Sequence, residues 1–204
     1  MLFEQGHEIH HVYIPEDAVV SLMRTIDDED VLEVGLIGGE GIVGPQVLSP
    51  SGKATVRGVV QGTGSAWRLP VATFEHLRAD LPQLDDLVIR HAAFLYNQAT
   101  QSIACQRFHR IEQRLARWLA MMCDRTGQRQ YRVTHDFLAE MLGVTRPSAT
   151  LAVKELRSQG AITMKVRDLQ VENLERLRAT ACACYGADRQ AYKIAMHEDR
   201  KRKR

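Results

Sequence analysis

The stretch THDFLAEMLGVTRPSATLAVKELRSQG, residues 134–160, decides the fold of this chain, because it predicts two short helices joined by a tight turn. Thr134 and Thr145 each precede a helical pattern, and a threonine hydroxyl there accepts a hydrogen bond from a backbone N–H of the first turn. Gly143 interrupts the first pattern, where a left-handed backbone suits glycine. Pro147 lies in the first turn of the second helix, where its missing N–H costs little.

Apolar residues recur at helical spacing on both predicted helices. They are Phe137, Leu138, Met141 and Leu142 on the first helix, and Ala149, Ala152, Val153 and Leu156 on the second, which Gly160 closes. A helix, a three-residue turn and a second helix with polar side chains at its exposed start make up the helix-turn-helix that reads DNA. An ordinary helical hairpin is the alternative interpretation of this stretch taken alone.

A predicted β-hairpin after the second helix favours the DNA-binding interpretation. Residues 161–165 and 169–172 alternate as strands across the turn at 166–168, and residues 131–133 predict a short strand ahead of the two helices. A hairpin in this place is typical of the wing of a winged helix. Arg167 at its tip would lie close to the DNA backbone.

Further helices are predicted on both sides of this unit. Residues 109–123 carry an apolar face, and their arginines are expected to form a solvated face. Asn173 is a candidate cap for a helix over residues 174–184. Beyond Gly186 the sequence is polar and basic, with a pattern that permits a helix as far as His197.

The first 80 residues predict β structure. Five short segments are rich in Val and Ile and are separated by Gly, Asp and Pro turn signals; they lie at 11–15, 18–26, 31–37, 55–61 and 65–69. Many short strands of this kind are typical of a sandwich or a jelly-roll barrel. The sequence GEGIVG at 39–44 matches the dinucleotide pattern GxGxxG only formally, because Pro45 and Pro50 follow and no helix opens there. These glycines are expected to serve tight turns.

A long helix is predicted from Pro82 to about Gln106, after a short helix at 71–79. Its stripe at three- and four-residue steps consists of Leu84, Leu87, Val88, His91, Phe94, Leu95, Gln98 and Ser102. Such a stripe, continued over many turns, predicts a dimer seam between two copies of the helix. Packing of the helix on its own β-domain alone is the alternative. His91 is expected to be a packed, hydrogen-bonded residue rather than a ligand.

The composition is that of a globular protein, with 45% hydrophobic and 25% charged residues among 204. No apolar run approaches the ~20 residues of a membrane span and no signal-like start is present, so a cytoplasmic protein without membrane association is expected. The cysteines include no CxxC pair and are expected to be reduced, mostly buried thiols without a metal; they are Cys105, Cys123, Cys182 and Cys184.

Charge is distributed unevenly along the chain, although the net charge is only +2. Residues 1–104 hold 6 Lys and Arg against 14 Asp and Glu, whereas residues 105–204 hold 21 against 11. An acidic first half joined to a basic second half suggests that the second half alone meets a polyanion. The basic run at 200–204 is either an arm on DNA or a solvated end.

The chain resembles the Crp/Fnr family of bacterial transcription regulators. The resemblance rests on HVYIPEDAVVSL (11–22), EVGLIGGEGIVGP (33–45), CQRFHRIEQRLARWL (105–119), THDFLAEMLGVTRPSAT (134–150) and ACACY (181–185) after the wing. It implies an α+β fold with an N-terminal jelly-roll β-barrel, a long dimerisation helix and a C-terminal winged helix-turn-helix. The corresponding segments are 1–80 for a cyclic-nucleotide-binding-like domain, 81–106 for the dimer helix, 107–185 for the DNA-binding domain and 186–204 for a basic tail. The family has a strand and helix ahead of the part that matches residues 2–9, so the barrel is expected to begin late.

The resemblance also implies a homodimer through residues 82–106 on a palindromic operator of double-stranded DNA, with RNA polymerase as a partner. Arg146 matches the family's base-reading arginine, which can bond guanine O6 and N7 together. Lys154 is expected on phosphate. The full set of expected DNA-binding residues is Thr134, Thr145, Arg146, Ser148, Thr150, Lys154 and Arg167. Pro147 and Leu151 depart from the family's readers and predict a different operator.

The matching effector positions are Gly44, Pro45, Gln46, Lys53 and Ala54. The family's cyclic-AMP site resembles Gly-Glu-Leu followed by Arg-Ser or Arg-Thr. Proline cannot make the glutamate's bonds to ribose, and lysine lacks the two-pronged guanidinium. Cyclic AMP is therefore not expected in the usual mode, and the small-molecule effector is left open.

Two other functions remain as alternatives. One is an effector-independent DNA-binding or partner-recruiting protein with a degenerate sensor domain. The other is an enzyme that uses a metal on His7, His10 and His11. No Ser/His/Asp order, HExxH motif or phosphate loop supports catalysis, so no enzyme is expected.

Overall fold

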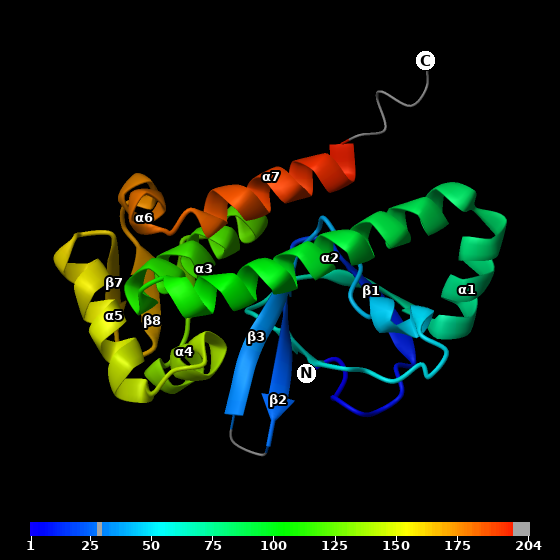
Figure 1. The fold of residues 1–204 in the computed structure, drawn as a ribbon, viewed down its shortest axis with the longest axis horizontal. Coiled ribbons are helices and arrows are strands. Elements are labelled where there is room, and N and C mark those ends of the chain that lie inside the picture. Colours follow the sequence, from blue (N-terminus) through cyan, green and yellow to red (C-terminus); the bar gives the residue numbers. More distant parts are fainter. Residues whose placement is uncertain (28–29, 198–204) are drawn as a thin grey trace.

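Strands come first and helices dominate the rest of the structure, a computed structural model that describes residues 1–27 and 30–197 (Figure 1). The β-rich part holds β1 (His11–Pro15), β2 (Val20–Ile26), β3 (Asp30–Ile37), the 3-10 helix η1 (Pro45–Leu48), β4 (Arg57–Val60) and β5 (Ala66–Pro70). Two helices follow, α1 (Val71–Asp80) and α2 (Pro82–Phe108). The remainder contains α3 (Ile111–Thr126), β6 (Gln130–Arg132), α4 (His135–Leu142), α5 (Arg146–Ser158), β7 (Ile162–Lys165), β8 (Asp168–Val171), α6 (Leu174–Thr180) and α7 (Cys184–His197).

Two small antiparallel sheets form the β-rich part. β2 lies between β3 and β4 in one sheet, and β1 pairs with β5 in the other. Single bridges join strands to segments outside them, such as Tyr13 of β1 with Val43 and Gly58 of β4 with Phe3. Within the described residues the strands do not close into a barrel, because these connections make isolated bridges where closure needs continuous ladders. The α+β class is confirmed, with two open sheets in the place of the predicted jelly-roll barrel.

α2 turns the stripe that was predicted as a dimer seam toward its own chain. Val88 and Phe94 are buried, and the Phe94 ring centroid lies 5.7 Å from that of Tyr192 on α7. The buried Gln98 side chain accepts a 2.6 Å hydrogen bond from the Leu36 N–H of β3. These buried residues hold α2 against the β-rich part and α7, although Leu87 of the same stripe is exposed. The buried part of the stripe is therefore not a dimer seam, and α2 packs on α7 as well as on the β-rich part that the alternative named.

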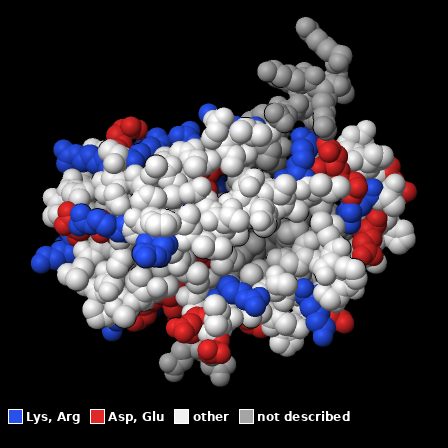
Figure 2. All heavy atoms as spheres, viewed as in Figure 1, with Lys and Arg blue, Asp and Glu red and all other residues white. Residues whose placement is uncertain are grey.

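A different stripe of α2 is exposed. It consists of Ile89, Ala93, Tyr96, Thr100 and Ile103, at alternating steps of four and three residues, with the exposed Phe108 after it. This spacing is that of the a and d positions of a coiled coil. The surface over the middle of α2 is mostly white in Figure 2, which marks few charged side chains there. An unpartnered apolar stripe is therefore present on α2, on a different side from the predicted one.

The C-terminal part is a winged helix-turn-helix. α3, α4 and α5 pack around a core that includes Leu115, Leu138 and Leu156. β8 lies between β6 and β7 in an antiparallel sheet beside them. The same core takes in Met23 and Leu36 of the β-rich part, so the two parts of the chain share one continuous apolar interior.

The helix predicted over residues 174–184 is wrong in its second half. α6 ends at Thr180, because Ala181 takes an extended backbone with ψ 143°. α7 begins at Cys184 and runs alongside α2 (Figure 1). Two short segments separated by a break therefore replace one continuous helix.

The predicted basic tail from residue 186 is helical through His197. Its last part, residues 198–204 with the basic run at 200–204, lies outside the described residues. In the described part of the chain, no helix is both long and apolar enough to cross a bilayer.

Candidate nucleic-acid interface

Hydrogen bonds at the helix starts fix the geometry of α4 and α5. Thr134 Oγ1 accepts a hydrogen bond from the Phe137 N–H at 3.1 Å, and Thr145 Oγ1 accepts one from the Ser148 N–H at 3.4 Å. Gly143 takes φ 60° and ψ 48°, a left-handed backbone that lets the chain turn directly after α4. The two caps and the turn therefore lie where the sequence predicted them.

One side of α5 is buried and the other is available to a ligand. The buried side consists of Ala149, Ala152, Val153 and Leu156. Arg146, Thr150 and Lys154 are exposed, and Ser148 is half-buried. A helix that offers one polar and basic face in this way fits the major groove of B-DNA, which is wide enough to admit it.

Arg146 is the first residue of α5, and its side chain is 67% exposed. Its Nε lies 3.2 Å from Asp136 Oδ1 on α4, and both side chains of this ion pair are open to solvent. Exposed ion pairs contribute little free energy, so Asp136 can orient Arg146 without competing strongly with a better acceptor. The Thr150 hydroxyl donates to the Arg146 carbonyl oxygen at 3.0 Å and steadies the first turn of α5.

Leu151 is 66% exposed on the same side of α5. It lines a surface groove together with Ile111, Ser148 and Lys154. The sequence had marked Leu151 only as a departure from the family's pattern. In the structure its side chain is open to solvent beside Ser148 and Lys154.

β7 and β8 form a hairpin with Val166 and Arg167 in its two-residue turn, since Lys165 pairs with Asp168. Val166 has φ 56°, a left-handed backbone in which a β-branched residue is strained. The Arg167 carbonyl oxygen accepts a 2.8 Å hydrogen bond from the Val133 N–H, which ties the turn to the strand before α4. Arg167 itself is exposed at the tip of the wing.

Basic side chains recur around the end of the molecule where α5, α6 and the wing lie (Figure 2). Arg146, Ser148, Thr150 and Lys154 share one helix, and Arg167 stands on a separate element. Thr134 and Thr145 are engaged as helix caps, with Thr134 half-buried and Thr145 exposed.

The predicted effector residues have mixed surroundings. Gly44, Pro45 and Ala54 are buried, and Ala54 belongs to the hydrophobic core of the β-rich part. Gln46 is half-buried in η1, whereas Lys53 is exposed. Lys53, the cation among the predicted effector residues, therefore lies on the surface, whereas Gly44, Pro45 and Ala54 are buried.

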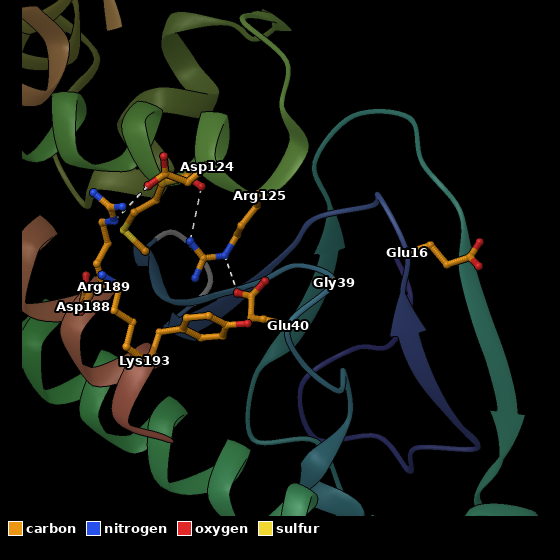
Figure 3. A pocket seen from close by; sticks show the side chains of 10 residues that line it. Glu16, Gly39, Glu40, Asp124, Arg125, Asp188, Arg189 and Lys193 are labelled. Atoms are coloured by element: carbon orange, nitrogen blue, oxygen red, sulfur yellow. Dashed lines mark hydrogen bonds and ion pairs between the residues drawn. The ribbon is translucent and has the colours of Figure 1, made fainter. Parts of the chain in front are cut away.

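A cleft lies between the glycine-rich loop, the end of α3 and α7 (Figure 3). Arg125 Nε donates a 2.5 Å hydrogen bond to Glu40 Oε1, and these side chains point toward one another in Figure 3. Arg189 Nε lies 3.8 Å from Asp124 Oδ2 on the same wall. These four charged groups are engaged with one another, and the Arg125–Glu40 pair joins the winged domain to the β-rich part.

Glu33 of β3 makes a second connection between the two parts. Its carboxylate accepts hydrogen bonds from the Ser21 hydroxyl and from Trp118 Nε1 on α3, the latter at 3.0 Å. Burial raises the pKa of Glu33 to about 7. The charge of this carboxyl group therefore changes near neutral pH at the boundary between the β-rich part and the winged domain.

His91 is packed and hydrogen-bonded, as the sequence predicted. Its Nδ1 accepts a hydrogen bond from the Ile42 N–H at 3.3 Å. Burial lowers the pKa of His91 to about 4, so the ring is neutral at physiological pH. Its contact with the segment around Gly41 positions that loop against α2.

Three of the four cysteines come together, which the sequence did not predict. Cys105, Cys182 and Cys184 form a buried cluster of their own, and the Cys105 and Cys182 sulfur atoms lie 3.5 Å apart. Spacing rules missed this group because these two residues are separated by 77 positions. Two local signals were present in the sequence: Cys105 and His109 lie one helical turn apart, and Cys182 and Cys184 form a Cys-x-Cys pair. Cys123 lies elsewhere, in the core of the winged domain.

Comparison with known proteins shows which domain and which solved structures this chain resembles. Residues 113–180 match the family model of the Crp-like helix-turn-helix domain. No curated protein sequence matches the chain. Among solved structures, FixK2 from Bradyrhizobium japonicum has a TM-score of 0.71 at 15% identity, covering 89% of this chain and 92% of that one.

Two further structures have the same architecture. A CRP-family transcriptional regulator from Thermus thermophilus has a TM-score of 0.67 at 18% identity, covering 88% of this chain and 95% of that one. The c-di-GMP responsive global regulator CLP from Xanthomonas campestris has a TM-score of 0.63 at 19% identity, covering 83% and 88%. The chain therefore has the fold of Crp/Fnr regulators and contains a Crp-like helix-turn-helix domain, which confirms the resemblance seen in the sequence.

Proposed function

We propose that this protein is a transcription regulator that binds double-stranded DNA as a homodimer through its winged helix-turn-helix. The proposal rests on the exposed face of α5, the helix whose first residue is Arg146. This helix lies inside the region that matches the Crp-like helix-turn-helix domain. The caps at Thr134 and Thr145 fix the starts of α4 and α5, which suits the outer face of α5 to the major groove.

Each side chain of the proposed interface has a role that suits its chemistry. Arg146 reads guanine through O6 and N7, a contact worth roughly 1–3 kcal/mol of discrimination. Ser148 and Thr150 contact phosphate or base edges near the start of α5. Lys154 and Arg167 contact phosphates, where they add affinity without sequence information.

Leu151 adds a specific apolar contact to this set. It is exposed between positions that face the groove, and its side chain has no polar group to satisfy. Thymine is the base that offers a methyl group in the major groove. The operator half-site therefore carries a thymine opposite Leu151 and a guanine opposite Arg146.

The homodimer forms through the exposed stripe of α2 that contains Ile89, Tyr96 and Ile103. Burial of such a heptad stripe against its symmetry mate removes apolar surface from water and aligns two winged domains about a two-fold axis. The matching operator is a palindrome with half-sites about one helical turn, ~34 Å, apart.

The β-rich part senses a small-molecule signal other than cyclic AMP in its usual mode. The contacts of Glu33 with Trp118 and of Glu40 with Arg125 connect it to α3, so a ligand that alters them shifts the winged domain. A ligand shifts this equilibrium only by its differential affinity for the two states. RNA polymerase is the expected partner at the promoter.

Genomic selection followed by footprinting tests the proposal. The wild type should protect a two-fold site. Arg146→Ala should lose about tenfold or more in affinity for that site and little for random DNA, whereas Lys154→Ala should weaken binding to both alike. Arg68→Ala, at an exposed arginine of β5, is the matched control and should bind as the wild type does. Selection that yields no preferred sequence would refute the proposal.

The placement of Lys53 and Ala54 favours one alternative, a DNA-binding or partner-recruiting protein whose sensor domain no longer binds an effector. DNA affinity that no cyclic nucleotide, redox agent or metabolite changes would support it. Within the described residues, His7, His10 and His11 do not gather into a group of three ligand atoms.

A further inference from the structure

The cluster formed by Cys105, His109, Cys182 and Cys184 has the composition of a metal site. The four ligand atoms all lie within 4.8 Å of one another. Cys105 belongs to the last turn of α2 and His109 is the residue that caps that helix. Cys182 lies in the break between α6 and α7, and Cys184 is the first residue of α7. Two segments far apart in the sequence therefore supply two ligands each.

We propose that these four residues bind one zinc ion in tetrahedral geometry. Zn²⁺ bonds thiolate sulfur at about 2.3 Å and imidazole nitrogen at about 2.0 Å, which places the corners of a tetrahedron roughly 3.5–3.8 Å apart. The Cys105 and Cys182 sulfur atoms are 3.5 Å apart, and the Cys184 sulfur lies 3.4 Å from His109 Nδ1. These separations require only small movements to close around a single ion.

The same separations argue against a polynuclear iron–sulfur cluster. Its four cysteines are shared among two or more iron atoms, so sulfur atoms on different irons must stand farther apart than those around one ion. Three thiolates and one imidazole are also a ligand set of structural zinc sites, in which all four positions are filled by protein. A closed Cys₃His site on one zinc ion is therefore the assignment that fits.

A hydrogen-bond donor and two arginines lie around the cluster. Gln101 Nε2 donates a 2.9 Å hydrogen bond to the Cys184 sulfur, as groups around metal-bound thiolates commonly do. Arg117 on α3 is close enough to interact electrostatically with Cys105 and Cys182, and Arg114 does the same. Arg117 is paired with the buried Asp188, so the charge of Arg114 is what offsets the single negative charge that three thiolates leave on a divalent ion.

The apolar cores do not account for this arrangement. The three sulfur-bearing side chains form a buried cluster separate from both hydrophobic cores, so they pack mainly on one another. An ion there would bind the end of α2 to the link between α6 and α7. It would thereby fix α7 along α2 and hold the winged domain where the chain passes from α2 into α3.

Zinc binding by the full-length chain tests the proposal without DNA. Protein purified under reducing conditions should contain one zinc per chain by elemental analysis. Replacement with Co²⁺ should give the intense visible bands of a tetrahedral ion together with thiolate charge-transfer absorption. Cys182→Ser and His109→Ala should each lower zinc affinity at least tenfold in competition with a chromophoric chelator.

Two variants keep the test decisive. Cys123→Ser removes the buried cysteine outside the cluster and should retain one zinc per chain. His109→Cys supplies a fourth thiolate and should retain zinc where His109→Ala loses it, which separates ligation from a folding defect. Circular dichroism of all variants reports whether the fold is kept.

The proposal is overturned if the reduced wild type binds zinc no better than Cys182→Ser, or if all cysteine variants, Cys123→Ser included, lose zinc equally. The proposal would also be overturned if Cys105 and Cys182 form a disulfide and the dithiol obtained by reducing it does not bind zinc. These outcomes are independent of operator binding, so failure of the zinc site and failure of the DNA-binding proposal are distinguishable.

Discussion

Replacing Glu33 with glutamine should remove a pH dependence at the boundary between the β-rich part and the winged domain. The Glu33 carboxyl group contacts Ser21 and Trp118, and burial raises its pKa from 4.5 to about 7. Between these values the folded protein holds a proton that the unfolded chain has released. The free energy of unfolding should therefore fall as the pH rises through this window.

One pKa unit corresponds to about 1.4 kcal/mol, so ionised Glu33 lowers the free energy of unfolding by up to ~3 kcal/mol once the pH exceeds its folded pKa. This contribution to stability is fully present below the unfolded pKa and is lost as the pH rises through the folded one. Glutamine stays neutral, and its amide oxygen still accepts from the Trp118 indole N–H. Glu33→Gln should therefore match the wild type near about pH 4.5 and exceed its stability near about pH 8.

Urea unfolding followed by circular dichroism at these two pH values measures the effect. Glu75→Gln, at an exposed glutamate of α1, is the control and should leave the difference between the two pH values unchanged. If Glu33→Gln changes stability equally at both pH values, Glu33 does not titrate near neutrality and the argument from burial fails.

Three further changes test other elements. Leu151→Ala should lower affinity for the selected operator about tenfold while leaving random DNA unaffected, as gel-shift titration would show; an equal loss on both would contradict a thymine contact. Tyr96→Glu should shift a homodimer toward monomer in sedimentation equilibrium, because it places a charge on the exposed stripe of α2; an unchanged dimer would exclude this stripe. Val166→Asn should raise the free energy of unfolding by about 1 kcal/mol, since asparagine tolerates the left-handed backbone at φ 56°. Denaturation showing a loss instead would mean that Val166 makes a contact worth more than its strain.

The helix-turn-helix was predictable because its signals are local. Thr134 and Thr145 act on N–H groups three residues away, and Gly143 satisfies a backbone conformation at its own position. The strands of the β-rich part were located for the same reason. Whether they close into a barrel or stay in two open sheets was not predictable, because closure depends on ladders between segments that are distant in sequence.

The break between α6 and α7 lay beyond the same local rules. The pattern of residues 174–184 permits one helix, but the chain ends α6 at Thr180 and places α7 along α2. Packing of Tyr192 on Phe94 stabilises that arrangement, and such a contact cannot be predicted from the sequence of either segment alone.

The sequence by itself determined most of the elements, the caps of α4 and α5 and the position of Arg146 at the start of α5, since these depend on neighbours within a few residues. Only the tertiary structure decided which face of α2 is buried. The spacing of apolar residues along a helix does not show whether its apolar side packs against the same chain or another. The same holds for the sulfur atoms of Cys105 and Cys182, 77 positions apart and 3.5 Å from one another. Helical propensity acts along the chain, whereas a buried seam and a four-ligand cluster arise only when distant segments pack together.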